Sequence, residues 1–147
     1  CYKKTGARGY NPSTPHYGID RDSYYQCSDQ RNAPGDPIYP ICAGTFVKVY
    51  EKHADFGNSV WINSSNPNTT AITTGAYIRH LYMHFNSKPL VSVGDPVTTG
   101  TLLGYMGTTG NSTGVHLHFG IQARNTAYTS SDGYTTSGFF DPEIILK

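Results

Sequence analysis

Apolar positions along this chain come in short runs that alternate with polar positions and are broken by Gly and Pro. The runs are rich in Val, Ile, Tyr, Phe and Thr, and no stretch repeats at the helical period of about 3.6 residues. The pattern predicts strands over residues 37–41, 44–51, 59–63, 77–85, 102–106 and 115–123. Short, evenly spaced strands separated by turn residues predict an all-β fold, either an antiparallel β-sandwich or a partly open barrel.

Two segments lack apolar periodicity and predict long loops. Residues 64–75 are mostly Ser, Asn and Thr, and residues 124–138 carry Tyr128 and Tyr134. Loops of this length in a compact domain are often functional, so we expect them to wall a groove. Residues 139–146 form an apolar tail that we expect to dock on the body of a single domain spanning residues 1–147.

Composition narrows the function classes. Eleven Lys and Arg against ten Asp and Glu give a net charge of +1, and only 14% of residues are charged, against about 25% in an average domain. Such a chain lacks the clustered basic stripe of a nucleic-acid-binding protein, and it has no apolar run long enough for a membrane-spanning helix. Its six His accompany only two Glu, so imidazole is the abundant candidate for acid–base chemistry.

Three cysteines leave one without an intramolecular partner. Cys27 and Cys42 bracket a segment rich in Pro and Gly, and a disulfide closing it would stabilise the fold by about 3 kcal/mol. We expect that pairing, with reduced thiols as the alternative. Because the chain starts at Cys1 rather than Met, we expect a processed form or an excised domain.

A pair of histidines lies in the apolar run 115–123. His116 and His118 are two residues apart, so on a strand both imidazoles face the same side. Leu117 and Phe119 then face the opposite side, toward a core. Two imidazoles on one face of a rigid strand form half of a recognisable metal site.

His16 and Asp20 form a second candidate pair of ligands. In an extended chain, residues four apart are separated by about 13 Å, too far for one ion with bonds of about 2.0–2.2 Å. The chain must therefore bend between them, and Gly18 permits that bend.

The longer context of the His pair carries a specific resemblance. Residues 91–119, VSVGDPVTTGTLLGYMGTTGNSTGVHLHF, closely resemble the lysostaphin-type (LytM-domain) zinc metallopeptidases, whose pattern runs from V-x-x-G-D to G-x-H-[LV]-H-F. The segments 16–20, 57–62, 82–84 and 141–142 are similar to the other motifs of that family, in the same order. Two departures are a long insert over 21–32 and Val115, which replaces the usual Pro before the His pair.

The resemblance implies roles for individual residues. His16, Asp20 and His118 would hold one Zn²⁺, and His116 and His84 would be the two active-site histidines that do not bind metal. We expect His116 to be the general base and His84 to bind the attacking water or the oxyanion, with the swapped assignment open. Tyr10 matches a family tyrosine that stabilises the tetrahedral intermediate. We expect Tyr82, His80 and Asn111 to contact the substrate.

The implied function is zinc-dependent hydrolysis of peptide bonds in peptidoglycan, in its cross-bridge or its stem peptide. The donor set agrees, because two imidazoles and one carboxylate leave a coordination position for water, as in catalytic zinc sites. We expect a monomer that acts at the cell wall as a secreted enzyme, a phage lysin or a virion component, alone or within a larger multidomain lysin.

Two other readings stay open on the residues. A LytM domain that only binds or regulates wall enzymes usually lacks a ligand or an active-site histidine, and this chain keeps all five. A cupin-like metal site also begins with H-x-H, but here Gln122 replaces the required Glu and no His follows His118. A non-haem iron oxygenase would prefer H-x-D to the H-x-x-x-D found here, and metal analysis of the purified protein would separate iron from zinc.

Overall fold

The computed structural model describes residues 2–4, 10–13, 16–23 and 35–145. Within them the chain forms ten strands and one short 3-10 helix, and these residues contain no α-helix. The elements are listed in chain order: β1 (Tyr2–Lys4), β2 (Ile19–Ser23), β3 (Pro37–Ile38), β4 (Gly44–His53), β5 (Gly57–Ser65), β6 (Tyr77–Phe85), β7 (Pro96–Val97), β8 (Gly104–Tyr105), β9 (Leu117–Arg124), β10 (Phe139–Phe140) and η1 (Pro142–Ile144).

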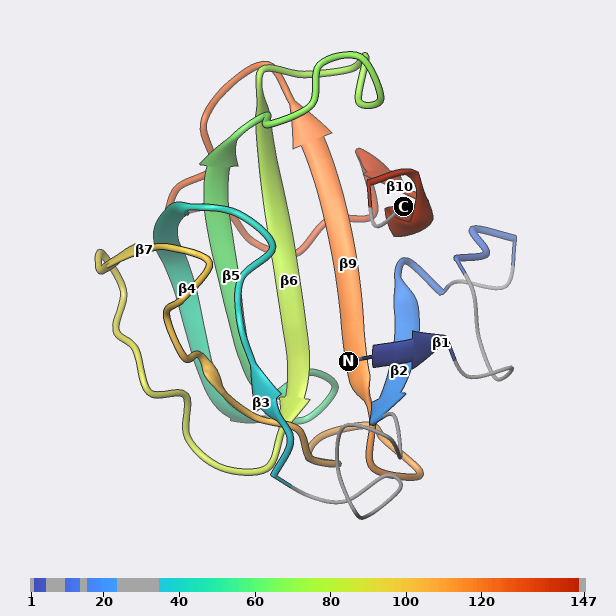
Figure 1. The fold of residues 1–147 in the computed structure, drawn as a ribbon, viewed down its shortest axis with the longest axis vertical. Coiled ribbons are helices and arrows are strands. Elements are labelled where there is room, and N and C mark those ends of the chain that lie inside the picture. Colours follow the sequence, from blue (N-terminus) through green and yellow to red (C-terminus); the bar gives the residue numbers. More distant parts are fainter. Residues whose placement is uncertain (1, 5–9, 14–15, 24–34, 146–147) are drawn as a thin grey trace.

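One large antiparallel sheet organises the fold. Its strand order is β1-β2-β9-β6-β5-β4-β7, with β10 also paired to β9, while β3 and β8 form a separate two-stranded sheet (Figure 1). The predicted all-β class is confirmed, because the described residues form strands and no α-helix. Both sheets are antiparallel, and neither closes into a barrel. Among the described helices, none is long and apolar enough to cross a membrane.

The predicted strands are present with shifted ends. The prediction over 77–85 coincides with β6, and those over 44–51, 59–63 and 115–123 correspond to β4, β5 and β9. The predictions over 37–41 and 102–106 shrink to the two-residue strands β3 and β8. The predicted docking of the C-terminal tail is confirmed, because β10 pairs with β9 and both Phe140 and Ile145 pack on the core.

The two faces of the large sheet differ in what covers them. The core face, which carries Val60, Tyr82 and Phe119, packs against Ile38 and Leu103 in the main hydrophobic cluster. Strand β3 lies in front of β5 and β6 on this side in Figure 1. The opposite face, called here the second face, carries a smaller cluster whose buried members are Val47, Trp61, Leu81 and Met83. Cross-strand register puts His118 on the second face, because it lies directly opposite Met83.

Candidate active site

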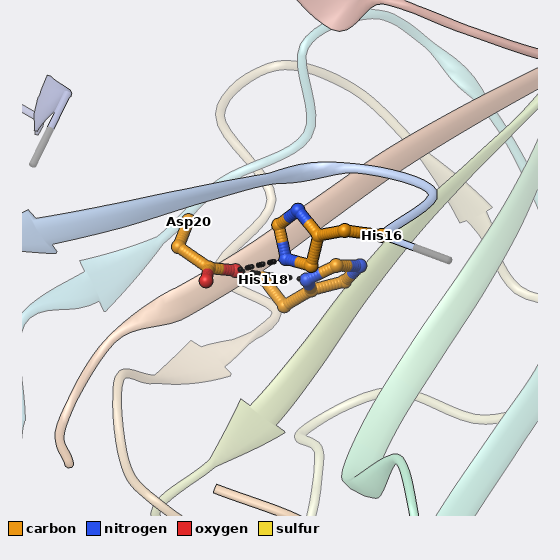
Figure 2. A group of neighbouring side chains, drawn as sticks. All are labelled: His16, Asp20 and His118. Atoms are coloured by element: carbon orange, nitrogen blue, oxygen red, sulfur yellow. Dashed lines mark hydrogen bonds and ion pairs between the residues drawn. The ribbon is translucent and has the colours of Figure 1, made fainter. Parts of the chain in front are cut away.

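His16, Asp20 and His118 come together on the second face at the start of β9. The Nε2 of His16 lies 3.2 Å from Asp20 Oδ1, and the Nδ1 of His118 lies 2.9 Å from the same oxygen (Figure 2). All three donor atoms lie within 4.8 Å of one another. Figure 2 shows both imidazoles directed at the Asp20 carboxylate, so the three predicted ligands converge on one point.

Strand pairing explains this convergence. Asp20 in β2 is directly opposite His118 in β9, so their side chains share a face. The predicted bend is present, because the chain bends at Gly18 between His16 and the start of β2. Gly18 lies at the bend as predicted, although its φ is not in the left-handed region, and a Cβ there would lie 2.6 Å from His118 Nε2. A glycine is required because the chain passes directly over the His118 ring.

Two of the three separations between donor atoms suit a single divalent ion, and the third, between the two imidazoles, is at most 4.8 Å. In a tetrahedral site with bonds of about 2.0–2.2 Å, neighbouring ligand atoms lie about 3.4 Å apart. The separations of 3.2 Å and 2.9 Å from Asp20 Oδ1 are close to that value. Burial alone would raise the pKa of Asp20, but hydrogen bonds from His118 and His16 outweigh it and hold that pKa well below its usual range. Burial lowers the pKa of His118, partly offset by Asp20, which favours the neutral imidazole that binds metal.

A second pair of imidazoles borders these three residues. The rings of His84 and His116 lie 4.9 Å apart, and His116 Nε2 is 3.7 Å from Asp20 Oδ1. His116 Nδ1 lies 2.7 Å from the Gly114 carbonyl, and His84 Nδ1 lies 2.7 Å from the Thr109 carbonyl. Because a carbonyl oxygen only accepts, Nδ1 carries the proton in both rings, and the neutral rings therefore present the Nε2 lone pair.

An unusual backbone conformation places His84. Its φ is +68°, in the left-handed region that a non-glycine residue rarely adopts. The alternation along β6 breaks at this point, and His84 turns toward His116 instead of joining Tyr82 on the core face. His84 is 6% exposed, and burial lowers its pKa to about 4 despite the Thr109 hydrogen bond. The ring is therefore neutral at neutral pH.

The predicted substrate contacts of His80 and Tyr82 are wrong. His80 is 0% and Tyr82 1% exposed, and both lie on the core face, away from His118. The Ser64 hydroxyl donates to the Ala43 carbonyl at 2.6 Å, so its oxygen accepts from His80 Nε2 at 2.9 Å. His80 Nδ1 in turn accepts from the Tyr82 hydroxyl at 2.9 Å. The error follows from the alternation of side chains along β6. Residues 80 and 82 share the core face, whereas the break in alternation at residue 84 turns His84 toward the second face.

Three further predictions are not tested by the structure. The Tyr10 hydroxyl donates to the Phe139 carbonyl at 3.0 Å, so its catalytic role stays a prediction. Asn111 is exposed in the loop before His116, and its role in substrate binding stays a prediction as well. Cys42 carries a free thiol 3.8 Å from His80 Nε2, and Cys27 lies outside the described residues. The predicted disulfide is therefore untested.

The two predicted groove loops lie in different places. Residues 64–75 connect the end of β5 to the start of β6, at the end of the sheet opposite to His84 (Figure 1). They border an open depression of about 540 Å³ lined by residues 42–45 and 63–67, away from the imidazoles. Residues 125–138, by contrast, pass behind the sheet in Figure 1 and fold over the second face. Of the two candidates, only this connection reaches the face that carries the site.

Sequence reasoning missed the residues that orient the site. Thr109 holds the His84 ring through its carbonyl, and its hydroxyl donates to the Phe85 carbonyl at 2.7 Å. Arg79 and Gln122, both fully buried, bind the 125–138 connection. The signal for Thr109 was its place in the family-like stretch, whereas nothing in the sequence marks Arg79 or Gln122. His53 lies outside the two histidine clusters, and its Nδ1 accepts from the Asp55 and Phe56 backbone amides in a turn.

Comparison with known proteins agrees with this site. Lysostaphin from Staphylococcus simulans is 34% identical over 118 residues, covering 80% of this chain and 21% of that protein. Glycyl-glycine endopeptidase ALE-1 from Staphylococcus capitis is 34% identical over 118 residues, covering 80% and 28%. Peptidoglycan DD-endopeptidase ShyB from Vibrio cholerae is 31% identical over 117 residues, covering 80% and 25%. The chain thus spans between a fifth and a third of the length of these curated relatives.

The same likeness extends to solved structures and to the family pattern. The catalytic domain of lysostaphin from S. simulans matches with a TM-score of 0.70 at 28% identity, covering 99% of this chain and 92% of that one. The sequence pattern described as Peptidase family M23 matches residues 15–130, which include all five residues of the two clusters. The lysostaphin-type resemblance is confirmed: the chain belongs to peptidase family M23, a family of zinc metallopeptidases.

Proposed function

We propose that this chain is a zinc-dependent endopeptidase that hydrolyses peptide bonds in peptidoglycan. The observation that carries the proposal is the convergence of five side chains at one end of the second face. Asp20 Oδ1 receives two imidazoles, at 3.2 Å and 2.9 Å, and His116 Nε2 approaches the same oxygen to 3.7 Å. Three of these side chains can bind a metal ion, and the imidazoles of the other two stay available as bases.

His16, Asp20 and His118 would hold the ion, and three protein ligands leave a position open for water. Zinc bound there supplies Lewis acidity, which acidifies water and polarises an amide carbonyl. The carboxylate and two imidazoles match zinc, whereas the three cysteines lack the spacing of a structural zinc site.

His116 is our candidate for the general base. Its Nδ1 proton is held by the Gly114 carbonyl, so Nε2 accepts a proton from the attacking water and then returns it to the leaving amine. The side chain is 17% exposed, which lets the ring exchange its proton with solvent. His84 is more deeply buried and stays neutral, so its Nε2 accepts a hydrogen bond from the same water and orients it.

The substrate class rests on the relatives. One of them is named as a glycyl-glycine endopeptidase and another as a peptidoglycan DD-endopeptidase, so both names describe cleavage within a peptide. We therefore propose the peptide cross-bridge or stem peptide as substrate, with Asn111 as a contact beside His116. We propose action at the cell wall by one catalytic domain over residues 1–147.

Digestion of purified cell walls tests the proposal. Walls with glycine cross-bridges and walls with direct D-amino-acid cross-links are incubated with the purified protein, and the cut bond is identified by mass spectrometry. We expect new amino termini from one wall type, with about one zinc per chain by elemental analysis and loss of cleavage after chelation. His53→Ala, a histidine outside the two clusters, should cleave like the wild type. A zinc-loaded protein that cuts neither wall would contradict the proposal.

A further inference from the structure

Two buried polar side chains bind the connection between β9 and β10. Arg79 Nη1 donates to the Gly133 carbonyl at 3.1 Å. Gln122 Nε2 donates to the carbonyls of Thr135 and Ser137, at 2.9 Å and 2.8 Å. These three bonds fix the backbone of the connection on both sides of residue 134.

Arg79 and Gln122 form one unit on the second face. They lie directly opposite each other on β6 and β9, and Gln122 Oε1 accepts from Arg79 Nε at 2.9 Å and from Nη2 at 2.6 Å. Arg79 is 0% and Gln122 1% exposed. The guanidinium lies 4.7 Å from the centre of the Trp61 ring and 4.8 Å from that of Tyr128.

Fold stability alone is a weak explanation for this arrangement. Among the described residues, no carboxylate forms an ion pair with Arg79, and its hydrogen bonds go to neutral groups, while Asp132, which is paired with Arg124, acts on it only at longer range. Burying a charge in this way is costly, and an apolar pair would fill the same space at lower cost. The arginine is explained better by what its hydrogen bonds hold in place.

Tyr134 is the side chain held between these anchors. It is 42% exposed, although its ring contacts Phe56 at 5.1 Å, Phe139 at 6.0 Å and the buried Trp61 at 6.1 Å between centres. Because the ring packs on other aromatic rings on one side and is exposed to solvent on the other, Tyr134 can offer a ring face and a hydroxyl to a ligand at low entropic cost.

The rings beside Tyr134 lead to both halves of the active site. On one side, Phe139 stacks on Tyr17 at 5.2 Å, and Tyr17 directly follows the ligand His16. On the other side, the carbonyl of Phe56 accepts from the His84 backbone amide at 3.0 Å. Tyr17, Phe139, Tyr134 and Phe56 thus form a continuous row, called here the aromatic row, from the metal ligands to the second histidine pair.

We propose that Tyr134 determines substrate specificity by contacting the peptide next to the bond that is cut, and that Arg79 and Gln122 position it. This inference rests on the proposed peptidoglycan endopeptidase function. A glycine-rich or D-alanyl peptide offers mainly peptide planes, Cα–H groups and carbonyls. An aromatic face suits the planes and Cα–H groups, and the Tyr134 hydroxyl can donate to a carbonyl.

The contact is tested by steady-state kinetics on two probes, pentaglycine and a D-alanyl-linked muropeptide dimer. On the probe that the wild type cleaves, Tyr134→Ala should raise KM about tenfold with kcat within about twofold, because it removes binding shared by ground state and transition state. Tyr105→Ala is the matched control, since Tyr105 is 37% exposed on the separate two-stranded sheet. An unchanged KM for Tyr134→Ala overturns the inference and leaves the proposed function intact; a wild type that cleaves neither probe overturns both.

The positioning role is tested with a double-mutant cycle. Gln122→Ala and Arg79→Met should each raise KM as Tyr134→Ala does, and should add less than about twofold to KM in the Tyr134→Ala background. Arg79→Lys, which can still donate to the Gly133 carbonyl, should restore part of the affinity. If the effects on KM multiply in full, the two residues do not act through Tyr134. Gln122→Ala keeps the cycle informative if Arg79→Met fails to fold.

Discussion

Strand β6 carries two histidines, His80 in its middle and His84 near its end, that differ in what they can do. His80 and His84 are both buried, and burial lowers their pKa values to about 3 and about 4. Both nitrogens of His80 are bound by side chains, Ser64 at one and Tyr82 at the other. Only Nδ1 of His84 has a hydrogen-bond partner among the described residues, which leaves Nε2 available in a ring whose centre lies 6.0 Å from that of His118.

This difference shows that a lowered pKa does not by itself identify a reactive histidine. Structural hydrogen-bond networks perturb titration as strongly as active sites do. The distinguishing property is a nitrogen without a partner on the face where other catalytic groups gather. His80 is held in a chain of donors and acceptors that ties the backbone at Ile41 and Ala43 to the sheet.

The largest expected effect comes from His118→Ala, which changes a predicted metal ligand beside His84. Because it removes one of three ligands, zinc and cleavage should be lost together, with activity down by at least about 10³-fold. Elemental analysis and cleavage of wall fragments provide the two readouts. His80→Ala should keep its zinc; loss of zinc from His80→Ala instead would remove the distinction between His80 and the active-site histidines.

His116→Ala separates metal binding from proton transfer. We expect zinc content to stay near one per chain while kcat falls by about 10²–10⁴-fold, the usual contribution of a general base. Rates on a soluble wall peptide measure the effect. Turnover near the wild-type rate would show that His116 is not the base, and a large loss in His84→Ala would then support the swapped assignment.

His80→Ala should act on stability instead. The change leaves the Ser64 and Tyr82 hydroxyls without their buried partner and opens a cavity, so the free energy of unfolding should fall by about 2–4 kcal/mol. Urea denaturation measures this value, and cleavage per folded molecule should stay within about twofold of the wild type. Tyr82→Phe, which removes one hydroxyl, should cost less. If His80→Ala lost activity but kept its free energy of unfolding, His80 would have a catalytic role instead of a structural one.

The last expected effect is a change in how steeply stability depends on pH, which is small over any single pH unit. His80 has a pKa of about 3 in the folded protein, against about 6.5 when unfolded, so between these values only the unfolded state binds the proton. Stability should therefore fall as pH drops from about 6.5 toward 3, by up to about 1.4 kcal/mol per pH unit from this group. His80→Gln should flatten that slope in urea titrations from pH 4 to 7. Equal slopes for the two proteins would show that His80 does not titrate on unfolding.

Local patterns predicted the parts of the molecule whose side chains alternate regularly. The pattern around residues 116 and 118 predicted that both imidazoles lie on one side, and both lie near Asp20 in the structure. Leu117 and Phe119 are in the core, as expected. Strand β2 was missed because its sequence, IDRDS, has one apolar residue and no alternation of apolar and polar types. Strands β7 and β10 have only two residues each, too few for any period to be visible.

The error at His80 and Tyr82 has one local cause. A regular strand would keep residues 80, 82 and 84 on the same face, and the prediction extended the role of His84 to its neighbours. The positive φ of His84 breaks that regularity, supported by a hydrogen bond from its backbone amide to the Phe56 carbonyl. No single-sequence pattern marks a non-glycine residue for this conformation.

The sequence by itself determined the all-β class, the order of the strands along the chain and the donor chemistry of the site. These follow from period-two patterning and from the residue types in the motifs. Only the tertiary structure decided which histidine keeps a free nitrogen and which face the 125–138 connection covers. The reason is that these outcomes depend on hydrogen bonds between distant residues, such as His118 with Asp20 and Arg79 with Gly133, separated by 98 and 54 positions. Such pairs form only when the register of the whole sheet is set.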